Sequence, residues 1–549
     1  MGYLRFLFIF IYIVLLTLIS WDINGNSWYG IDDANIYMVY MKNFANGHGL
    51  VYNIGGERVE GFTSLLWTLI GSLFFFISSQ PEIFLLVTNI LLVSYLLYRI
   101  TCSLGKNGQN LFLNKKSLWF LSIIGITPGF IDWTVLALMD TGLWCFLLTI
   151  TILTILNYNL SVNKLKHYSA LSLLYVLLVI CRPESMLWVP VFIILNAAQE
   201  YYISKSMRLV ILGLLSNFMV FLLSLFLLFF WRLDYFGYPL PNTYYAKVSS
   251  NRMDNFILGA NYIFNLFIQK PFILFILIHA TFFVFIKIIK KQIFPNMTIF
   301  ILFIIIIISL LIPFYTGGDH FGLHRFIMPS IPMMVLIWTL ILKSNLFDKP
   351  IIPILMALAV FLSNEHNIKE TYYHKNFPIR HEWVNVINGR NTSEKLNKFF
   401  VDHSKLPSQG VLSAGGTAFA YKGETIDLLG LNNTKMAHAK KVKDTSLLKN
   451  HASFNPDVFF ELSPDIFWYF NSRFLGVHHR LLKKLYINSK SFASIIFKKI
   501  HINPKFIKRY GFYRINRHNE NEALQIFANR LFIKSLDTSK YQIWEIEYE

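Results

Sequence analysis

Long apolar runs recur through the first two thirds of this chain and limit the folds that it can adopt. Runs of roughly 17–25 apolar residues cross a bilayer as single helices. Hydrophobic residues make up 54% of the 549 positions and charged residues only 15%, whereas a soluble globular protein is about a quarter charged. The sequence therefore predicts a mainly α, polytopic transmembrane helix bundle with about 11 spans. After the N-terminal run, the apolar segments lie near residues 62–79, 83–100, 117–131, 140–157, 168–181, 185–198, 209–230, 271–286, 296–313, 326–342 and 350–363.

The N-terminal segment, MGYLRFLFIFIYIVLLTLIS, is long and lacks a small-x-small cleavage site. It is therefore predicted to be an uncleaved first transmembrane helix with its N-terminus in the cytoplasm. The next two apolar segments raise a problem of parity. If 62–79 and 83–100 both cross the membrane, the basic loop at 99–116 lies outside. We expect one of the two to be re-entrant or to lie along the interface.

The formal net charge is +19. Nucleic-acid binding is one explanation, but a membrane protein collects basic residues in cytoplasmic loops and near anionic headgroups. We adopt the second explanation and expect no nucleic-acid partner. The predicted cytoplasmic loops are those at 99–116, 157–167, 199–208, 287–292 and 343–349. Every motif-like polar stretch then falls on the opposite side, which predicts a single extracytoplasmic site.

Two domains are predicted. Residues 1–363 form the transmembrane module, whose first extracytoplasmic loop is 22–63, and residues 364–549 form an extracytoplasmic α/β or α+β domain. This second region is polar and long enough for its own core. Its strand-like runs are GVLSAG, ETIDLLGL, DVFFEL and YQIWEIEYE, and EALQIFANRLF is helix-like.

The stretch from Asp32 to Ser64, DDANIYMVYMKNFANGHGLVYNIGGERVEGFTS, is too polar for hydrocarbon and is patterned. Asp32 and Asp33 open it, and a helical apolar pattern follows. A helix cap would explain one of the two carboxylates. The alternative is a general base that takes a proton from an acceptor hydroxyl. The second carboxylate would then orient the base, bind a sugar hydroxyl or hold a divalent cation.

Further charged residues of this loop could line a sugar pocket as a set, although each alone is more typical of a solvated or locally paired residue. They are His48, Glu57, Arg58 and Glu60. Asp140 lies in an apolar stretch, and ionisable residues at membrane depth usually face a cavity or a partner. It could also simply cap the next helix.

Arg182 and Glu184 flank Pro183 at a predicted helix break, where they could pair with each other or line a substrate site. Asn242, Thr243 and Lys247 lie in PNTYYAK, after a long apolar run. Tyrosine and lysine at an interface are also routine membrane anchors, so this motif is open to either reading.

The segment GGDHFGLHRF carries the second charged group, namely Asp319, His320, His324 and Arg325. Its glycines allow a close backbone approach to a ligand. Arg325 precedes an apolar helix and could donate a fork of hydrogen bonds to phosphate oxygens. Asp319 with the two histidines could instead hold a metal, although their spacing matches no zinc pattern. No cofactor is therefore assigned, and a divalent cation stays open.

Taken in order, these motifs resemble GT-C-type membrane glycosyltransferases. The branch of AftB-like mycobacterial arabinofuranosyltransferases and bacterial LphB-like proteins is the most similar. The resembling pieces are the Asp32–Ser64 stretch, LMDTGLW, CRPES, PNTYYAK, GGDHFGLHRFIMPSIP and ETIDLLGLNNTKMAH. They run from Asp32 to His438. The last hundred residues fall outside the resemblance.

The resemblance implies an inverting transfer of sugar from a polyprenyl-phosphate donor to a cell-envelope glycan or glycolipid. The site would face outward from a bacterial cytoplasmic membrane, and Asp32 or Asp33 would be the base. The branch has glutamate in a Gly-Leu-Glu-Thr-like motif where this chain has Asp140, which is shorter. A flippase of lipid-linked glycans and a ligase or polymerase with a diphosphate-linked donor are the alternatives. Charged clusters at one membrane face favour chemistry over passage.

Overall fold

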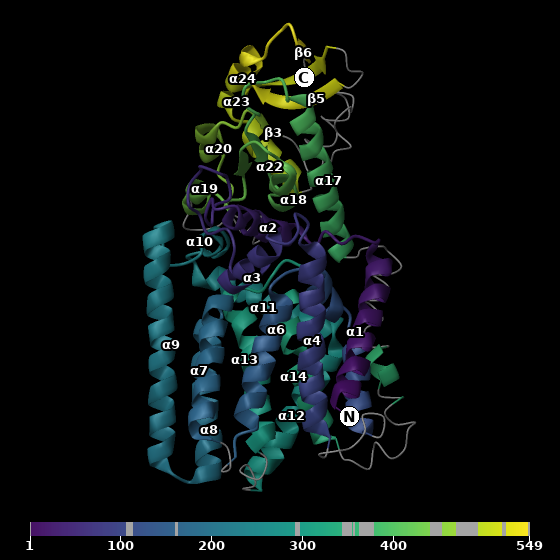
Figure 1. Ribbon diagram of the computed structural model, residues 1–549, viewed down its shortest axis with the longest axis vertical. Helices are drawn as coiled ribbons and strands as arrows, with labels where there is room; N and C mark the ends of the chain where they lie inside the picture. Colours follow the sequence, from purple (N-terminus) through teal and green to yellow (C-terminus); the bar gives the residue numbers. More distant parts are fainter. Residues whose placement is uncertain are drawn as a thin grey trace.

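The computed structural model describes residues 2–105, 114–159, 163–290, 297–342, 354, 357–361, 378–439, 453–467, 492–518 and 523–546. It shows a bundle of long helices with a smaller mixed domain stacked on one end (Figure 1). The N-terminus lies near the other end of the bundle. The mainly α bundle with a separate C-terminal domain is as the sequence predicts.

Eight helical segments of the described chain are long and apolar enough to cross a membrane. They are α1 (Gly2–Asn24), α4 (Glu82–Leu104), α7 (Lys164–Cys181), α8 (Ser185–Ser204), α9 (Met207–Phe236), α12 (Pro271–Ile289), α13 (Met297–Thr316) and the 3₁₀ helix η4 (Gly322–Ser330) continued by α14 (Ile331–Ile341). The predicted helix break at Pro183 is confirmed, because α7 ends at Cys181 and α8 begins at Ser185. The chain is thus a multi-pass membrane protein.

The described residues of the bundle also form shorter helices: α3 (Leu65–Phe75), α5 (Lys115–Gly125), the π helix η2 (Asp132–Leu136) and α6 (Thr141–Leu156). At 1.5 Å per residue, α3 is roughly 16 Å long, about half of a hydrocarbon core. It therefore cannot cross alone, which agrees with the expectation that one of 62–79 and 83–100 is not a full span. The predicted segment 350–363 lies largely outside the described residues, so the total of about 11 spans stays a prediction.

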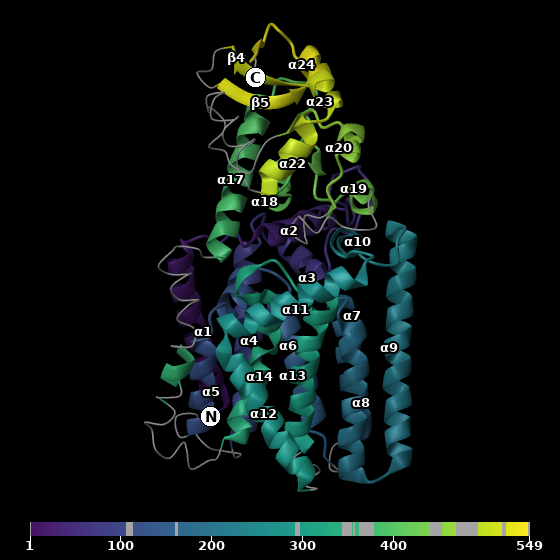
Figure 2. The ribbon, with the colours of Figure 1, turned by 180° about the vertical axis from the view of Figure 1, so that it is seen from behind.

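Three helices lie at the end of the bundle that faces the C-terminal domain (Figures 1 and 2): α2 (Asp32–Ala45), α10 (Asn242–Lys247) and α11 (Arg252–Gln269). The helical pattern predicted after Asp33 is confirmed as α2. Gly259 lets α11 approach α13 closely, since a Cβ there would lie 2.0 Å from the carbonyl oxygen of Phe314. This packing holds the middle of α11 beside the C-terminal end of α13.

The described residues of the C-terminal domain form a mixed six-stranded sheet in the order β2-β1-β3-β5-β4-β6. The strands are β1 (Gln409–Val411), β2 (Thr425–Asp427), β3 (Ile466–Phe467), β4 (Tyr510–Arg517), β5 (Ala523–Asn529) and β6 (Tyr541–Glu545). The helices are α17 (Pro378–Phe399), α18 (Gly415–Ala420), α19 (Thr434–His438), α20 (Pro456–Leu462), α22 (Phe492–His501), α23 (Pro504–Arg509) and α24 (Arg530–Ser535). The first three strands are parallel and the rest antiparallel.

The sheet has an apolar cluster on each face, as alternation along its strands requires. Phe467, Phe512 and Phe527 pack with α20, α22 and α23 on one face. Neighbouring positions on the same strands, such as Ile466 and Ile526, pack with α17 and α24 on the other.

Two of the predicted elements in this domain are wrong. DVFFEL forms helix α20 rather than a strand, because Asn455 caps the helix through the Asp457 N–H and Pro456 occupies its first turn. EALQIFANRLF is not one helix. Its first part is β5, which pairs with β4 from Ala523 to Asn529, and only Arg530–Ser535 is helical. Sheet pairing overrides the local helical preference there.

Candidate functional site

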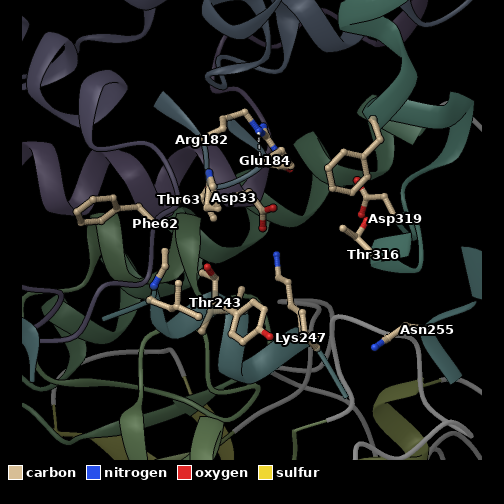
Figure 3. Close-up of a pocket in the computed structure, with 18 of the residues that line it drawn as sticks. Asp33, Phe62, Thr63, Arg182, Glu184, Thr243, Lys247, Asn255, Thr316 and Asp319 are labelled. Carbon is tan, nitrogen blue, oxygen red and sulfur yellow. Dashed lines mark hydrogen bonds and ion pairs between the residues drawn. The ribbon is translucent and has the colours of Figure 1, made fainter. Parts of the chain in front are cut away.

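A cavity of about 630 Å³ lies where the bundle meets the C-terminal domain. The predicted site residues that line it come from four separate stretches of the sequence: Asp33, Arg182, Glu184, Thr243, Lys247 and Asp319, which Figure 3 labels, and Arg325. Met139, beside Asp140, adds a fifth stretch, and Leu431 adds a contact from the C-terminal domain. The predicted convergence of the polar stretches on one site is therefore observed in the geometry.

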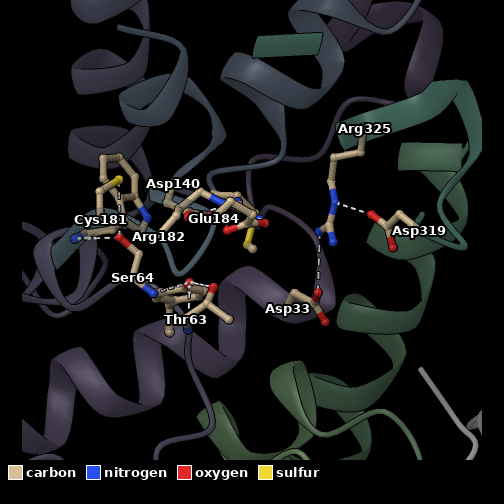
Figure 4. Close-up of polar contacts among 12 residues, drawn as sticks. Asp33, Thr63, Ser64, Asp140, Cys181, Arg182, Glu184, Asp319 and Arg325 are labelled. Atoms are coloured by element: carbon tan, nitrogen blue, oxygen red, sulfur yellow. Dashed lines mark hydrogen bonds and ion pairs between the residues drawn. The ribbon is translucent and has the colours of Figure 1, made fainter. Parts of the chain in front are cut away.

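Arg325 links Asp33 and Asp319, two carboxylates of the site that are far apart in the sequence (Figure 4). Its Nε donates to Asp319 Oδ2 at 2.7 Å, and its Nη1 lies 3.5 Å from Asp33 Oδ2. Burial opposes ionisation of Asp319, but Arg325 and His320 overcome it and hold the pKa of that carboxyl far below its usual range. The two residues before Arg325, Leu323 and His324, have left-handed φ angles of 60° and 58°. Such strain clusters at functional sites.

Arg182 forms the second ionic group. Its Nε and Nη2 donate to the two oxygens of Glu184 at 3.2 and 2.9 Å, and Nη1 donates to Asp140 Oδ2 at 3.1 Å. Burial raises the pKa of Glu184, but Arg182 reverses this and the pKa lies below its ordinary value. Asp140 is fully buried behind Arg182 and does not line the cavity. Its observed contact is thus with Arg182.

The two aspartates that open α2 lie in different surroundings. The backbone N–H groups of Gly415 and Gly416 donate to Asp32 Oδ2 and Oδ1 at 3.0 and 2.9 Å, so the Asp32 carboxylate faces the C-terminal domain. Burial raises the pKa of Asp32 to about 6 although these bonds lower it. Asp33 points the other way, lines the cavity and keeps about a fifth of its side chain exposed.

Helix α10 carries Thr243 and Lys247 to the cavity. No described residue forms a hydrogen bond or ion pair with the Lys247 ammonium, which points toward Asp33 (Figure 3). Asn242 turns away and donates to the carbonyl oxygens of Gly430 and Leu431 at 2.8 and 3.0 Å. The C-terminal domain therefore fixes the helix that presents Lys247.

The remaining predicted residues lie off the cavity. His48 is exposed, and Glu60 is buried in a fork with Arg232 of α9 at 2.9–3.1 Å. The His320 ring packs at a tilt against Phe321, and the buried His324 ring packs edge-on against Tyr262. Their assignment as substrate ligands stays a prediction that this geometry does not favour.

Several lining residues were not predicted from the sequence: Tyr37, Arg252, Asn255, Tyr315 and Phe326. Tyr37 follows Asp33 by one helical turn, which is a signal that the sequence contains. Its hydroxyl contacts Thr63 Oγ1 at 2.9 Å and accepts from the Thr63 and Ser64 N–H groups. Glu382 of α17 also lies near the aspartate pair, and burial raises its pKa to about 8. Nothing in the local sequence points to it.

A divalent cation does not fit the contacts of this cavity. Asp33 and Asp319 face Arg325, and Glu184 is held by Arg182. The described part of the chain contains no group of three histidine, cysteine or acidic side chains placed to hold a metal. The positive charge that faces these carboxylates is supplied by arginine.

No protein-family model and no curated protein matches this sequence. Solved structures do match the fold. The Archaeoglobus fulgidus oligosaccharyltransferase in its apo form aligns with 95% of this chain and 76% of its own, at 11% identity and a TM-score of 0.52. Its complex with Zn and sulfate aligns with 94% and 73%, at 13% identity and a TM-score of 0.50. These neighbours support the GT-C-type fold and not the narrower AftB-like or LphB-like branch.

Proposed function

We propose that this protein is a GT-C-type membrane glycosyltransferase that moves a sugar from a lipid-linked donor to an acceptor hydroxyl. The observation that carries the proposal is the convergence of Asp33, Arg325 and Lys247 on one cavity at one end of a membrane bundle. The fold likeness to oligosaccharyltransferases supports it. By the resemblance, the donor is a polyprenyl-phosphate sugar and the acceptor a cell-envelope glycan, outside a bacterial cytoplasmic membrane.

In this proposal Asp33 is the general base. It accepts the proton of the acceptor hydroxyl while that oxygen attacks the anomeric carbon, and the bond from this carbon to the phosphate oxygen breaks. A single backside displacement inverts the anomeric configuration. Asp32 is not the base, since both of its oxygens already accept backbone N–H groups.

The leaving phosphate needs cations, and two are available. Lys247 and Arg252 line the cavity, and neither forms an ion pair with any described residue. Arg325 and Arg182 are already shared with carboxylates, and each of these groups carries one excess negative charge. Lys247 and Arg252 are therefore the cations proposed to contact the leaving phosphate, in a site where a low dielectric constant strengthens the attraction. The choice of a monophosphate donor rests on the resemblance.

The lipid chain would lie along the apolar wall of the cavity. Leu187, Phe256, Tyr315 and Phe326 line that wall. Leu187 and Tyr315 are also 44% and 52% exposed. In this proposal the polyprenyl chain enters along this exposed apolar wall.

The test uses purified protein in lipid nanodiscs with a labelled polyprenyl-phosphate sugar and a glycan acceptor. Asp33→Asn should lower kcat by about 10²–10⁴-fold, the usual contribution of a general base. Asp234→Asn is the matched control, because Asp234 is exposed at the end of α9 and outside the cavity. Full activity of Asp33→Asn would refute the assignment of the base.

Two further arms test the class of reaction. Transfer from a polyprenyl-diphosphate sugar with none from the monophosphate would indicate a ligase or polymerase. In proteoliposomes, movement of the lipid-linked donor across the bilayer without its consumption would overturn the enzyme proposal in favour of a flippase.

A further inference from the structure

The first turn of α2, which carries Asp33, is anchored to the C-terminal domain on both sides of that residue. Asp32 accepts the N–H groups of Gly415 and Gly416 from α18. Asn35 Oδ1 accepts Arg390 Nε of α17 at 3.0 Å. Asp33 thus lies between two residues that are both bonded to another domain, more than 350 positions away in sequence.

Arg390 is the centre of this contact. Its Nη1 donates to Glu82 Oε1 of α4 at 2.8 Å, so one guanidinium ties α17 to both α2 and α4. The guanidinium carbon lies 4.4 Å from the ring centre of Tyr29 and 4.2 Å from that of Phe419. Forked donation and stacking on aromatic faces are properties of arginine that lysine does not reproduce.

Asn35 transmits this anchor to the chain that enters α2. Its Nδ2 donates to the carbonyl oxygens of Tyr29 and Ile31, both at 2.9 Å. The Asn35 side chain is fully buried, and both its Nδ2 and its Oδ1 form hydrogen bonds. A substitution of Arg390 that moves Asn35 would therefore also move the backbone directly before Asp33.

The backbone of α18 lies so close to the start of α2 that no side chain fits between them. A Cβ at Gly415 would lie 1.8 Å from the carbonyl oxygen of Asp32. Farther along the same loop, Asn53 and Thr425 exchange two bonds, Nδ2 to the carbonyl oxygen and the Thr425 N–H to Oδ1, both at 2.9 Å. The loop and the C-terminal domain form one continuous hydrogen-bonded contact.

We propose that Arg390 is a positioning residue for Asp33, so that the C-terminal domain sets the geometry of the catalytic loop. The inference rests on the proposed role of Asp33 as base. Arg390 does not line the cavity and acts through Asn35. A misplacement of about 1 Å at a reacting group can cost roughly 100-fold in rate, which is the scale expected on losing this anchor.

The test compares Arg390→Met and Arg390→Lys with Lys395→Met, an exposed residue of the same helix α17. Arg390→Met should lower kcat by roughly 100-fold and leave the KM for donor within about threefold, because the phosphate-binding cations are untouched. Arg390→Lys keeps the charge but loses the fork, so its kcat should be intermediate and its fold intact. A merely structural role would lower the amount of folded protein without this split between kcat and KM.

A second readout does not depend on activity. Asp33→Cys is labelled with a polar maleimide in the parent, Arg390→Met and Arg390→Lys backgrounds. The chain that keeps Asp33 is the blank for labelling of Cys102, Cys145 and Cys181. The labelling rate at position 33 should change at least tenfold in Arg390→Met and not in Lys395→Met. An unchanged labelling rate together with an unchanged kcat would overturn the proposal. If the labelling rate changes but the chain that keeps Asp33 transfers no sugar, the proposed function is refuted and the positioning role stands.

Discussion

Glu60 and Arg232 form a buried ion pair off the cavity, so we predict that Glu60 stabilises the fold and does not bind substrate. Both oxygens of Glu60 accept from the guanidinium at 2.9–3.1 Å, and the two side chains are only 1% and 3% exposed. Glu60→Gln keeps the shape but leaves the Arg232 charge buried without a counter-charge. Breaking a buried pair on one side costs about 3–5 kcal/mol.

The double variant Glu60→Leu/Arg232→Leu separates this charge effect from packing. Replacing both partners by apolar residues of similar volume is often close to neutral. Glu60→Leu and Arg232→Leu alone should each cost about 3–5 kcal/mol, so a double-mutant cycle on unfolding in detergent should give a coupling free energy above about 3 kcal/mol, the upper end of the usual range. The reasoning is refuted if Glu60→Gln unfolds like the parent protein while its KM for the sugar donor rises more than tenfold. Glu60 would then contact the substrate, as the loop sequence suggests.

Two further predictions concern the Lys247 ammonium and the buried carboxyls of Asp32 and Glu382. Lys247→Met should raise the KM for a lipid-phosphate donor about 10- to 100-fold, because one charge-assisted hydrogen bond of about 1.5–3 kcal/mol is lost, and Lys247→Arg should recover part of this loss in steady-state kinetics. An equal loss in Lys435→Met, an exposed control that does not line the cavity, would contradict a phosphate contact. Burial raises the pKa of Asp32 to about 6 and that of Glu382 to about 8, so both carboxyls bind protons more tightly in the folded state than in the unfolded chain. The stability that they contribute is present at low pH and is lost as the pH rises through about 6 and then about 8. Hydrogen-exchange protection of α2 should fall over this range, and Glu382→Gln should remove the upper part of the fall; protection that rises with pH would contradict the assignment.

Local pattern was a good guide wherever a residue's neighbours in sequence are also its neighbours in space. The helix after Asp33 and the break at Pro183 follow from periodicity and from proline chemistry. Arg182 pairs with Glu184, two positions away, and with Asp140. The sequence predicts the pairing with Glu184 as one of two alternatives, the other being that both residues line a substrate site. Pattern failed for DVFFEL and for the first half of EALQIFANRLF, where a cap or a pairing strand decides between helix and sheet.

The sequence by itself determined the membrane bundle, the polar C-terminal domain and the charged stretches from which the cavity is built. Hydropathy and the distribution of basic residues act over short distances along the chain, so they can be read without a fold. Only the tertiary structure decided which member of each charged set faces the cavity. Asp32 and Asp33 are adjacent and chemically identical, yet one is bonded to Gly415 and Gly416 and the other faces Arg325. Glu60 and Arg390 likewise take their roles from partners that are distant in sequence. Burial and pairing depend on how the two domains pack together, and this packing cannot be predicted from neighbouring residues in the sequence.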